Sequence, residues 1–198
     1  FWLDVAEDTN AGLFWCGPPQ QLRIWIRVDG KVLTTLSVPV AWKKGEPHHV
    51  AFSWGEELRI YLDGTLQCKR SYNGLMPRDL AAASLWVGKS APPMWVDEIR
   101  VSSAPRPPDL GAQPYRPDAD TLLLDHLDQT AAGFRTVTKP EVGPEGHLRG
   151  PLESIPGKHS EGLQLRGDAK DYTVLDQLAE AGVKTLCFHS QWSWMGYP

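Results

Sequence analysis

The chain lacks several features that would point to particular functions. Its 20 Lys and Arg residues are outnumbered by 24 Asp and Glu, so the net charge of −4 offers no basic surplus for nucleic-acid phosphates. No apolar run reaches the roughly 18 residues that a membrane-spanning helix needs. The sequence has no Gly-x-Ser-x-Gly, His-Glu-x-x-His or Cys-x-x-Cys motif, which removes three common hydrolase, zinc and redox signatures. We therefore expect neither nucleic acid nor a membrane as a partner.

Cysteine is also scarce. Cys16, Cys68 and Cys187 are the three cysteines, and their spacing fits no zinc motif. A disulfide between Cys16 and Cys68 and a set of small buried thiols both fit this pattern. The cysteines therefore do not decide whether the compartment is oxidising.

What the chain does contain favours a loop-rich β protein: 17 Pro, 18 Gly and 9 Trp in 198 residues. Residues 22–28 alternate apolar and polar side chains, as in a strand with one buried face. Asp-Gly pairs at 29–30 and 63–64 predict tight hairpins, because that turn needs positive φ. We expect residues 1–103 to form antiparallel strands, without a long helix. A shared buried face is predicted for Val50, Phe52, Ile60 and Leu62.

Residues 104–118 hold five prolines, which predicts either a linker or an extended strap over the sheets. Residues 119–170 form an irregular segment, with 129–156 interpreted as loop. Two strand-like runs in it, around 120–128 and 161–166, predict strands that either complete the first β domain or begin a second one. They are also expected to fill an edge that missing N-terminal strands would leave open.

Residues 171–198 change character. Asp171 is a suitable N-cap, and apolar side chains recur at helical spacing up to Gly182. A continuous apolar run follows at residues 183–188, as expected for a strand buried on both faces. This order predicts a helix–strand unit that opens a truncated α/β domain.

The stretch HHVAFSWGEELRIYLDG at residues 48–64, with LWVGK at 85–89 and WVDEIRVS at 95–102, resembles the C-terminal part of a laminin-G-like domain. The resemblance covers residues 1–118 and implies an antiparallel jelly-roll β-sandwich of the concanavalin A type, with its N-terminal strands missing. That architecture is mostly a recognition module. Because the sequence starts within an alternating strand, we interpret the chain as a piece of a larger protein.

The C-terminal segment VLDQLAEAGVKTLCFHSQWSWMGYP resembles the start of a barrel in bacterial proteins related to glycoside hydrolases. The resemblance implies that His189, Gln191 and Trp192 follow a barrel strand and contact substrate, since strand C-terminal ends build such sites. A buried strand with an exposed loop fits the same residues, so both interpretations stay open.

Catalysis by the β domain is not expected. Jelly-roll glucanases carry Glu-x-Asp-x-x-Glu on one strand, and this chain offers only Asp97 and Glu98 in the comparable strand. As neighbours in a regular strand they would face opposite sides, and we expect Asp97 to accept backbone hydrogen bonds or tie a loop. His48 and His49 would likewise face opposite sides and could not share an ion. No cofactor is predicted; calcium occurs in relatives, but no Asp-rich loop is present.

The nine tryptophans suggest sugar recognition, because indole rings stack on sugar faces. Trp54, Trp86 and Trp95 lie in strands at positions that predict core packing. Trp15 and Trp25 are the candidates for carbohydrate stacking, since the alternation places Trp25 on the polar face of its strand.

These observations predict a non-catalytic carbohydrate-binding or accessory module of a larger bacterial glycoside-hydrolase-like protein, secreted or periplasmic. Its partner would be a glycan or the adjacent catalytic domain. The alternative is an adhesion or scaffold module that binds proteins and has no sugar role.

Overall fold

The structure is a computed structural model that describes most of the chain. The described residues are 2–6, 9–16, 20–43, 45–54, 56–71, 84–87, 94–108, 110, 112–128, 140–143, 146–148, 153–165, 172–175 and 185–192. They form strands and turns and contain no helix, so the chain is mainly β. Within them no helix is long and apolar enough to cross a membrane.

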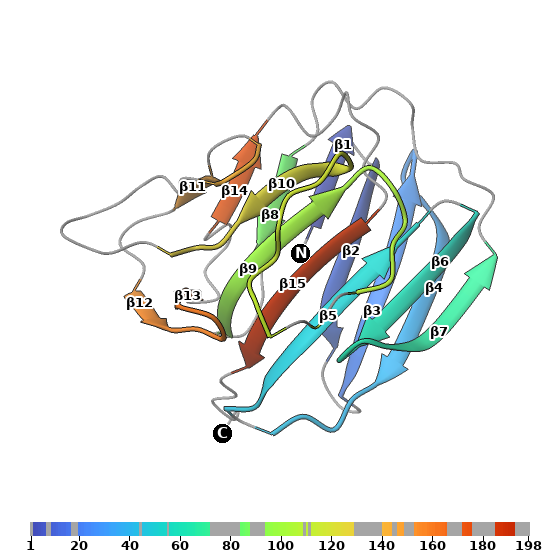
Figure 1. Ribbon diagram of the computed structural model, residues 1–198. Coiled ribbons are helices and arrows are strands. Elements are labelled where there is room, and N and C mark those ends of the chain that lie inside the picture. The colour runs from blue at the N-terminus through green and yellow to red at the C-terminus, as the bar shows by residue number, and fades with distance from the viewer. Residues whose placement is uncertain are drawn as a thin grey trace.

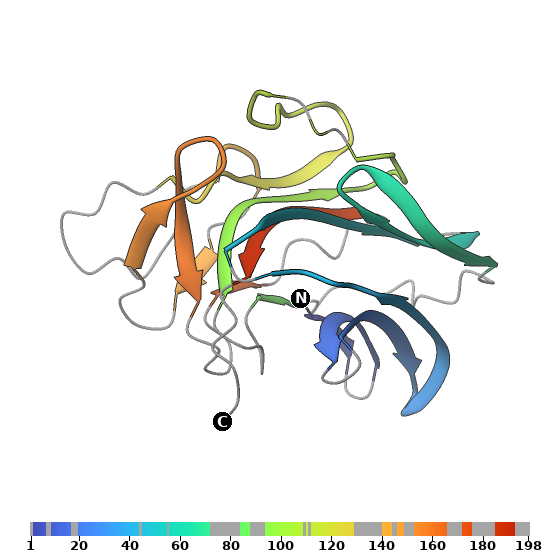
Figure 2. The same cartoon turned by 90° about the horizontal axis from the view of Figure 1, so that it is seen from below.

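The strands form two sheets that lie one over the other (Figures 1 and 2). The seven-stranded sheet runs in the order β11 (Gly146–Leu148), β14 (Tyr172–Leu175), β8 (Ser84–Val87), β1 (Trp2–Ala6), β2 (Thr9–Cys16), β3 (Gln21–Val28) and β4 (Lys31–Pro39). Each neighbouring pair is antiparallel, as expected for residues 1–103.

The second, eight-stranded sheet is also antiparallel throughout. Its order is β12 (Glu153–Pro156), β13 (Glu161–Leu165), β9 (Met94–Ser102), β15 (Thr185–Trp192), β5 (Pro47–Ser53), β6 (Glu57–Leu62) and β7 (Thr65–Ser71), with β10 (Thr121–Asp125) also paired to β9.

The main core lies between the two sheets, and both contribute to it. On β3 the side chains of Leu22, Ile24 and Ile26 are almost fully buried, while the residues between them are half-exposed. The predicted alternation is therefore confirmed. The facing sheet adds side chains from four strands: Val50, Phe52, Leu58, Ile60, Leu62, Val96, Ile99, Val101 and Leu163.

Both predicted Asp-Gly hairpins are present. Asp29 and Asp63 have φ of 47°, and the glycines that follow them have φ of 74° and 77°. Two consecutive positive φ values give the turn that matches strand twist. The second turn sets the register of β5 and β6, in which Val50 pairs with Leu62 and Phe52 with Ile60. The prediction that Val50, Phe52, Ile60 and Leu62 are buried together is therefore confirmed.

The proline-rich residues 104–118 lie as a strap over the eight-stranded sheet, on the side away from the main core (Figure 1). Tyr115 anchors this strap, with 7% of its surface exposed. It packs with Ala51, Tyr61 and Leu124 in a second, smaller apolar cluster. The segment was predicted to be either a linker or a strap, and the structure agrees with a strap.

Both strand-like runs of residues 119–170 join the larger sheet. β13 pairs with Met94–Val96 of β9, and β10 pairs with Ile99–Ser102 along the same strand. Both runs thus pair along β9; that they replace missing N-terminal strands stays a prediction. The assignment of 129–156 to loop is wrong in part, because β11 and β12 lie there. Their lengths of three and four residues are too short to show a periodic pattern.

The C-terminal segment differs from the expected helix–strand unit. Tyr172–Leu175 form strand β14 where the first helical turn was expected, and residues 176–184 lie outside the described part. Aromatic and β-branched side chains in the run Tyr-Thr-Val favour a strand. Thr185–Trp192 form β15, which pairs antiparallel with β5 on one side and β9 on the other. The apolar run is thus an inner strand of the larger sheet.

Cys68 is a free thiol on β7 of the larger sheet, whereas Cys16 lies on β2 of the smaller one. The structure therefore has no disulfide between them. Burial raises the pKa of the Cys68 thiol, which disfavours the reactive thiolate.

Candidate binding site

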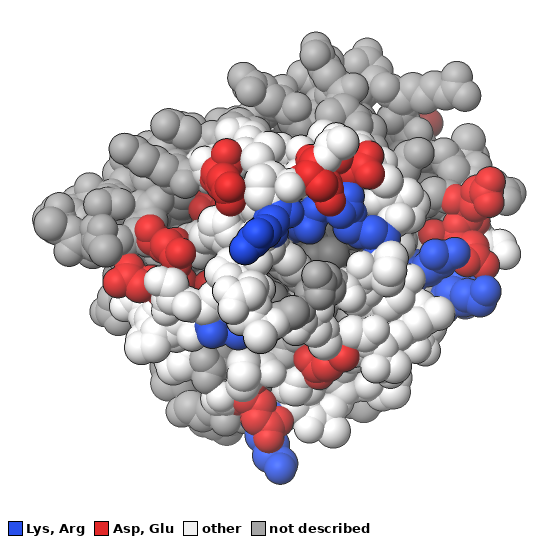
Figure 3. Space-filling view, in the orientation of Figure 1, with Lys and Arg blue, Asp and Glu red and all other residues white. Residues whose placement is uncertain are grey.

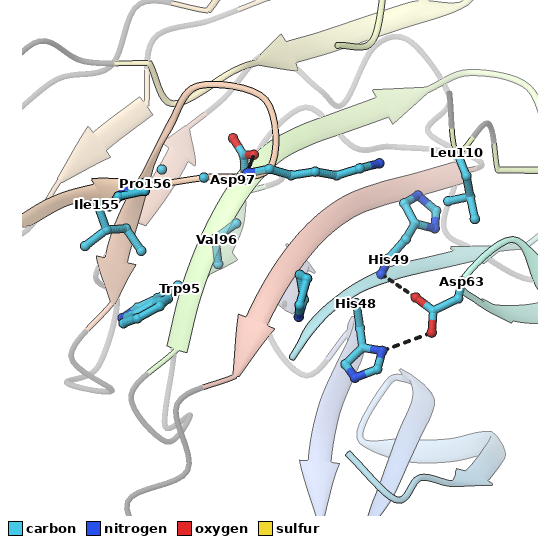
Figure 4. A pocket seen from close by; sticks show the side chains of 13 residues that line it. His48, His49, Asp63, Trp95, Val96, Asp97, Leu110, Ile155 and Pro156 are labelled. Carbon is cyan, nitrogen blue, oxygen red and sulfur yellow. Dashed lines mark hydrogen bonds and ion pairs between the residues drawn. The ribbon is translucent and has the colours of Figure 1, made fainter. Parts of the chain in front are cut away.

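A pocket of about 260 Å³ opens at one end of the eight-stranded sheet (Figure 4). β5 and the β6–β7 turn form one wall, and β9 with the β12–β13 hairpin forms the other. Leu110 of the strap contributes a third side. We call this the outer pocket.

β15 runs between the two walls of the outer pocket, as its ribbon in Figure 4 shows. Gln191 pairs with Trp95 on β9 and with Pro47 on β5, and His189 pairs with His49. Two of the sequence-predicted substrate residues are thus in register with residues that line the pocket. The side chains of β15 lie outside the described residues, so their contact with substrate stays a prediction.

Asp63 organises the wall on β5. One carboxylate oxygen accepts the His49 backbone N–H at 2.9 Å, and the other lies 2.9 Å from His48 Nδ1. Asp63 reaches both residues because the Asp-Gly turn brings it back over the start of β5. Both of its oxygens are engaged within the protein.

The two adjacent histidines turn to different sides of β5. The His48 ring stacks on Trp42 with centroids 4.4 Å apart, whereas His49 Nε2 lies 2.5 Å from the Tyr115 hydroxyl in the strap. This separation agrees with the prediction that they do not share an ion. Among the described residues, no group of three or more His, Cys, Asp or Glu side chains is placed to hold a metal ion.

Asp97 organises the opposite wall. Its Oδ2 accepts the backbone N–H groups of Lys158 and His159 at 2.5 and 3.1 Å, which ties the β12–β13 turn to β9. The prediction that Asp97 holds a loop through backbone hydrogen bonds is confirmed. Asp97 is only 6% exposed, and its Oδ1 has no hydrogen-bond partner among the described residues. Burial raises the pKa of this carboxyl group, an effect that the two backbone donors oppose.

Trp95 lies beside Asp97 in the same wall and is half-buried. It was expected in the core, where Trp54 is indeed found with 5% exposure. On β9 the core position is taken by Val96, so the neighbouring Trp95 faces the other side of the strand. The Trp95 Nε1–H has no acceptor in the described part of the chain. This wall of the pocket therefore contains one buried donor and one buried acceptor that have no partner among the described residues, on Trp95 and Asp97.

A register shift in β9 changes the expected orientation of the acidic pair. Val96 and Ile99 are both in the main core, and the pairing to β15 shifts between them. The two intervening residues, Asp97 and Glu98, therefore occupy the space of one, as in a β-bulge. Both of their side chains contact His159, Asp97 through the backbone N–H and Glu98 through the ring at 3.6 Å. The prediction that they face opposite sides is wrong, because it assumed a regular strand.

Glu98 is 1% exposed and connects three segments that lie outside the core. Its carboxylate accepts the Tyr115 backbone N–H at 3.0 Å and lies 2.6 Å from His126 Nδ1. The other ring nitrogen of His126 lies 3.0 Å from Glu141. The hydrogen bond to Glu98 is the main reason that the pKa of His126 rises to about 9. This cluster could not be predicted from the sequence, because the two pairs that His126 makes are 28 and 15 residues apart in the chain and follow no motif.

Trp15 and Trp25, which were predicted to stack on a sugar, lie on strands of the seven-stranded sheet. Trp25 is on β3 of the seven-stranded sheet, where its Nε1 donates to Asn10 Oδ1 at 3.1 Å and Arg27 lies over its ring at 5.2 Å. The Trp15 side chain is outside the described residues. The structure thus does not bring Trp25 to the outer pocket, and Trp95 takes the aromatic position there.

Comparison with known proteins finds no match to a family model, to a curated protein or to a solved structure.

Proposed function

We propose that this chain is a jelly-roll β-sandwich of the laminin-G-like, concanavalin A type. In this proposal it serves as a non-catalytic carbohydrate-binding or accessory module of a larger secreted glycoside-hydrolase-like protein. The two facing antiparallel sheets support the architecture. The observation that carries the binding function is the outer pocket, where Trp95 and Asp97 line the same wall and Asp97 Oδ1 has no partner among the described residues.

This wall suits the chemistry of a sugar. The apolar face of an indole packs on the C–H face of a pyranose ring, and its N–H donates to a hydroxyl. Asp97 Oδ1 is an acceptor for a second hydroxyl, and bonding there removes the cost of a buried unsatisfied oxygen. Small-molecule pockets commonly start at about 300 Å³. A volume of about 260 Å³ therefore suits one sugar residue and not a long oligosaccharide.

The same geometry favours binding without hydrolysis. A glycosidase needs an acid and a base or nucleophile on two sides of the scissile bond. Asp63 and Asp97 both line the outer pocket, but the two Asp63 oxygens already accept His49 N–H and contact His48. Asp97 has one oxygen tied to the β12–β13 turn. Asp97 therefore keeps one oxygen without a described partner, but Asp63 has no oxygen left to complete the pair of carboxylates.

The test is binding of the chain to a panel of soluble polysaccharides by titration calorimetry, with hydrolysis followed in the same samples. We expect binding without cleavage, and a loss of affinity of about tenfold or more in Trp95→Ala. Trp25→Ala is the matched control in the other sheet. Unchanged affinity in both Trp95→Ala and Asp97→Asn would remove the outer pocket as the site. Loss in Trp25→Ala alone would move the site to the seven-stranded sheet.

An adhesion or scaffold role is the second candidate, and a different surface supports it. Val32 and Leu33 on β4 and Leu66 on β7 are 43–50% exposed. These strands are the end strands of their sheets and lie next to each other. Exposed apolar side chains on edge strands favour pairing with another protein. Failure of every glycan to bind, together with concentration-dependent association that Leu66→Glu abolishes, would favour this role.

A further inference from the structure

A second cavity, of about 500 Å³, lies between the strap and β9. Its lining differs in kind from that of the outer pocket: three arginines, Tyr115 and four prolines, with Asp118 as the acidic residue. Figure 3 shows Lys and Arg side chains gathered near the centre of the face that carries the strap. We call this the strap cavity.

Arg100 forms the floor of the strap cavity. Its side chain is 8% exposed, and its Nη2 donates to Asp118 at 2.7 Å and to Thr121 Oγ1 at 2.9 Å. The guanidinium lies 5.7 Å from the centre of the Tyr115 ring. Its Nε–H is buried and has no acceptor among the residues that the structure describes. A charged donor left in this state favours an acceptor that comes from outside.

Asp118 shows that a carboxylate fits this set of arginines. Arg106 donates to both of its oxygens, through Nη1 at 2.5 Å and Nη2 at 3.1 Å, in the paired geometry that guanidinium and carboxylate prefer. The Arg106 hydrogen bonds are the first cause that holds the pKa of Asp118 well below its usual range. Asp118 is therefore ionised near neutral pH, and the three arginines leave a surplus of positive charge in the lining.

Arg116 is exposed and makes no hydrogen bond or ion pair with another described residue. It is thus available to a ligand at the cavity mouth. Pro107, Pro108, Pro114 and Pro117 add rigid, apolar walls that have no N–H to satisfy. A wall that is already ordered lowers the entropy lost on binding.

We propose that the strap cavity binds a sugar-sized organic anion with one carboxylate, of the uronic acid class. The carboxylate would meet Arg116 and the Arg100 Nε–H, while Tyr115 and the prolines pack on the ring. After Asp118 is counted the lining keeps two positive charges, and Asp120, whose carboxylate lies 3.4 Å from Arg106 Nη2, offsets one of them. A single negative charge matches the one that remains. The volume exceeds what an inorganic ion needs. The outer pocket takes no part, so this proposal can hold or fail independently of the proposed function.

The experiment is a calorimetric titration of the full chain with glucuronate, with glucose as the neutral analogue and sodium sulfate as the inorganic anion. We expect glucuronate to bind about tenfold or more tightly than glucose, and binding to weaken as salt rises. Arg116→Gln should weaken glucuronate about three- to tenfold. Arg116→Lys should lie between it and the parent, since it keeps the charge and loses the fork.

Lys31→Gln is the matched control, because it removes one positive charge from the exposed first residue of β4 in the other sheet. Equal loss in Lys31→Gln and Arg116→Gln would overturn the proposal, as would equal binding of glucose and glucuronate. Tighter binding of sulfate than of glucuronate would also overturn it. Trp95→Ala separates the two sites: unchanged glucuronate affinity supports the strap cavity, and its loss together with an unaffected Arg116→Gln would place the anion in the outer pocket.

Discussion

Nδ1 of His126 lies 2.6 Å from a carboxylate oxygen of Glu98, although 28 residues separate the two in the chain. The pair joins the end of β10 to the bulge in β9. Since Glu98 also accepts the Tyr115 backbone N–H, the same carboxylate holds the strap. A single buried acid thus fastens the end of β10 and the strap to β9.

The first prediction is a loss of stability at alkaline pH. The pKa of His126 is raised from 6.5 to about 9 in the folded chain. The protonated ring therefore stabilises the fold fully below pH 6.5, and this contribution is lost as pH rises towards 9. Because the ring is 23% exposed, we expect a contribution on the order of 1–2 kcal/mol. Urea unfolding at pH 6 and pH 9.5 should show a larger decline for the parent than for His126→Gln. Equal declines would contradict it.

The second prediction concerns Glu98 itself. Glu98→Gln keeps the shape but removes the charge that faces His126, and we expect the free energy of unfolding to fall by about 2–3 kcal/mol at pH 6. Glu141→Gln is the control, because Glu141 contacts the same ring and is 49% exposed. Its cost should stay below about 1 kcal/mol. Chemical denaturation measures the free energy of unfolding of both variants. Equal losses in Glu98→Gln and Glu141→Gln would show that the burial of Glu98 does not set the cost of removing its charge.

The third prediction tests the fit between the β12–β13 turn and Asp97. A Cβ at Gly157 would lie 2.7 Å from Asp97 Cγ and 2.9 Å from the Glu161 carbonyl oxygen. Gly157→Ala must therefore push the turn off β9, at a cost of about 1–3 kcal/mol, and weaken binding in the outer pocket. Gly30→Ala gives the comparison, since its φ of 74° strains alanine in open space. That variant should lose stability without any change in ligand affinity.

The fourth prediction concerns the main core. Ile60 is fully buried between the sheets, and Ile60→Ala should reduce the free energy of unfolding by about 2–5 kcal/mol through lost contacts and a cavity. Leu66 on the neighbouring β7 is 43% exposed, so Leu66→Ala should change the free energy of unfolding by about 0.5 kcal/mol or less. A large effect at Leu66 would indicate that this surface is covered by another molecule.

Features that depend on neighbouring residues were predictable from the sequence. The β5–β6 register follows from alternation and from the positive φ that Asp63 and Gly64 adopt. The role of Asp97 also followed from its place in a strand. The β-bulge that turns Glu98 to the same side as Asp97 could not be predicted, because a one-residue shift in pairing leaves no mark on a short apolar pattern.

Features that depend on distant pairing were not predictable. An unbroken apolar run such as residues 185–188 fits any strand with two covered faces, in a parallel barrel or in the middle of this sheet. The outer pocket combines β5, β9, the β12–β13 hairpin and the strap, and no motif links them. For this reason the sequence predicts Trp95 in the core and Trp25 as the residue that stacks on a sugar.

The position of β15 has a consequence for the order in which the chain matures. β5 and β9 do not pair with each other; each pairs with a strand that is translated more than 80 residues after it. A nascent chain that ends before residue 185 holds two separate half-sheets with unpaired inner edges, which are exposed to other strands in the meantime. Neither wall of the outer pocket has its neighbour until that last insertion. If the outer pocket is the binding site, as we propose, the chain acquires ligand recognition only after β15 has paired with β5 and β9.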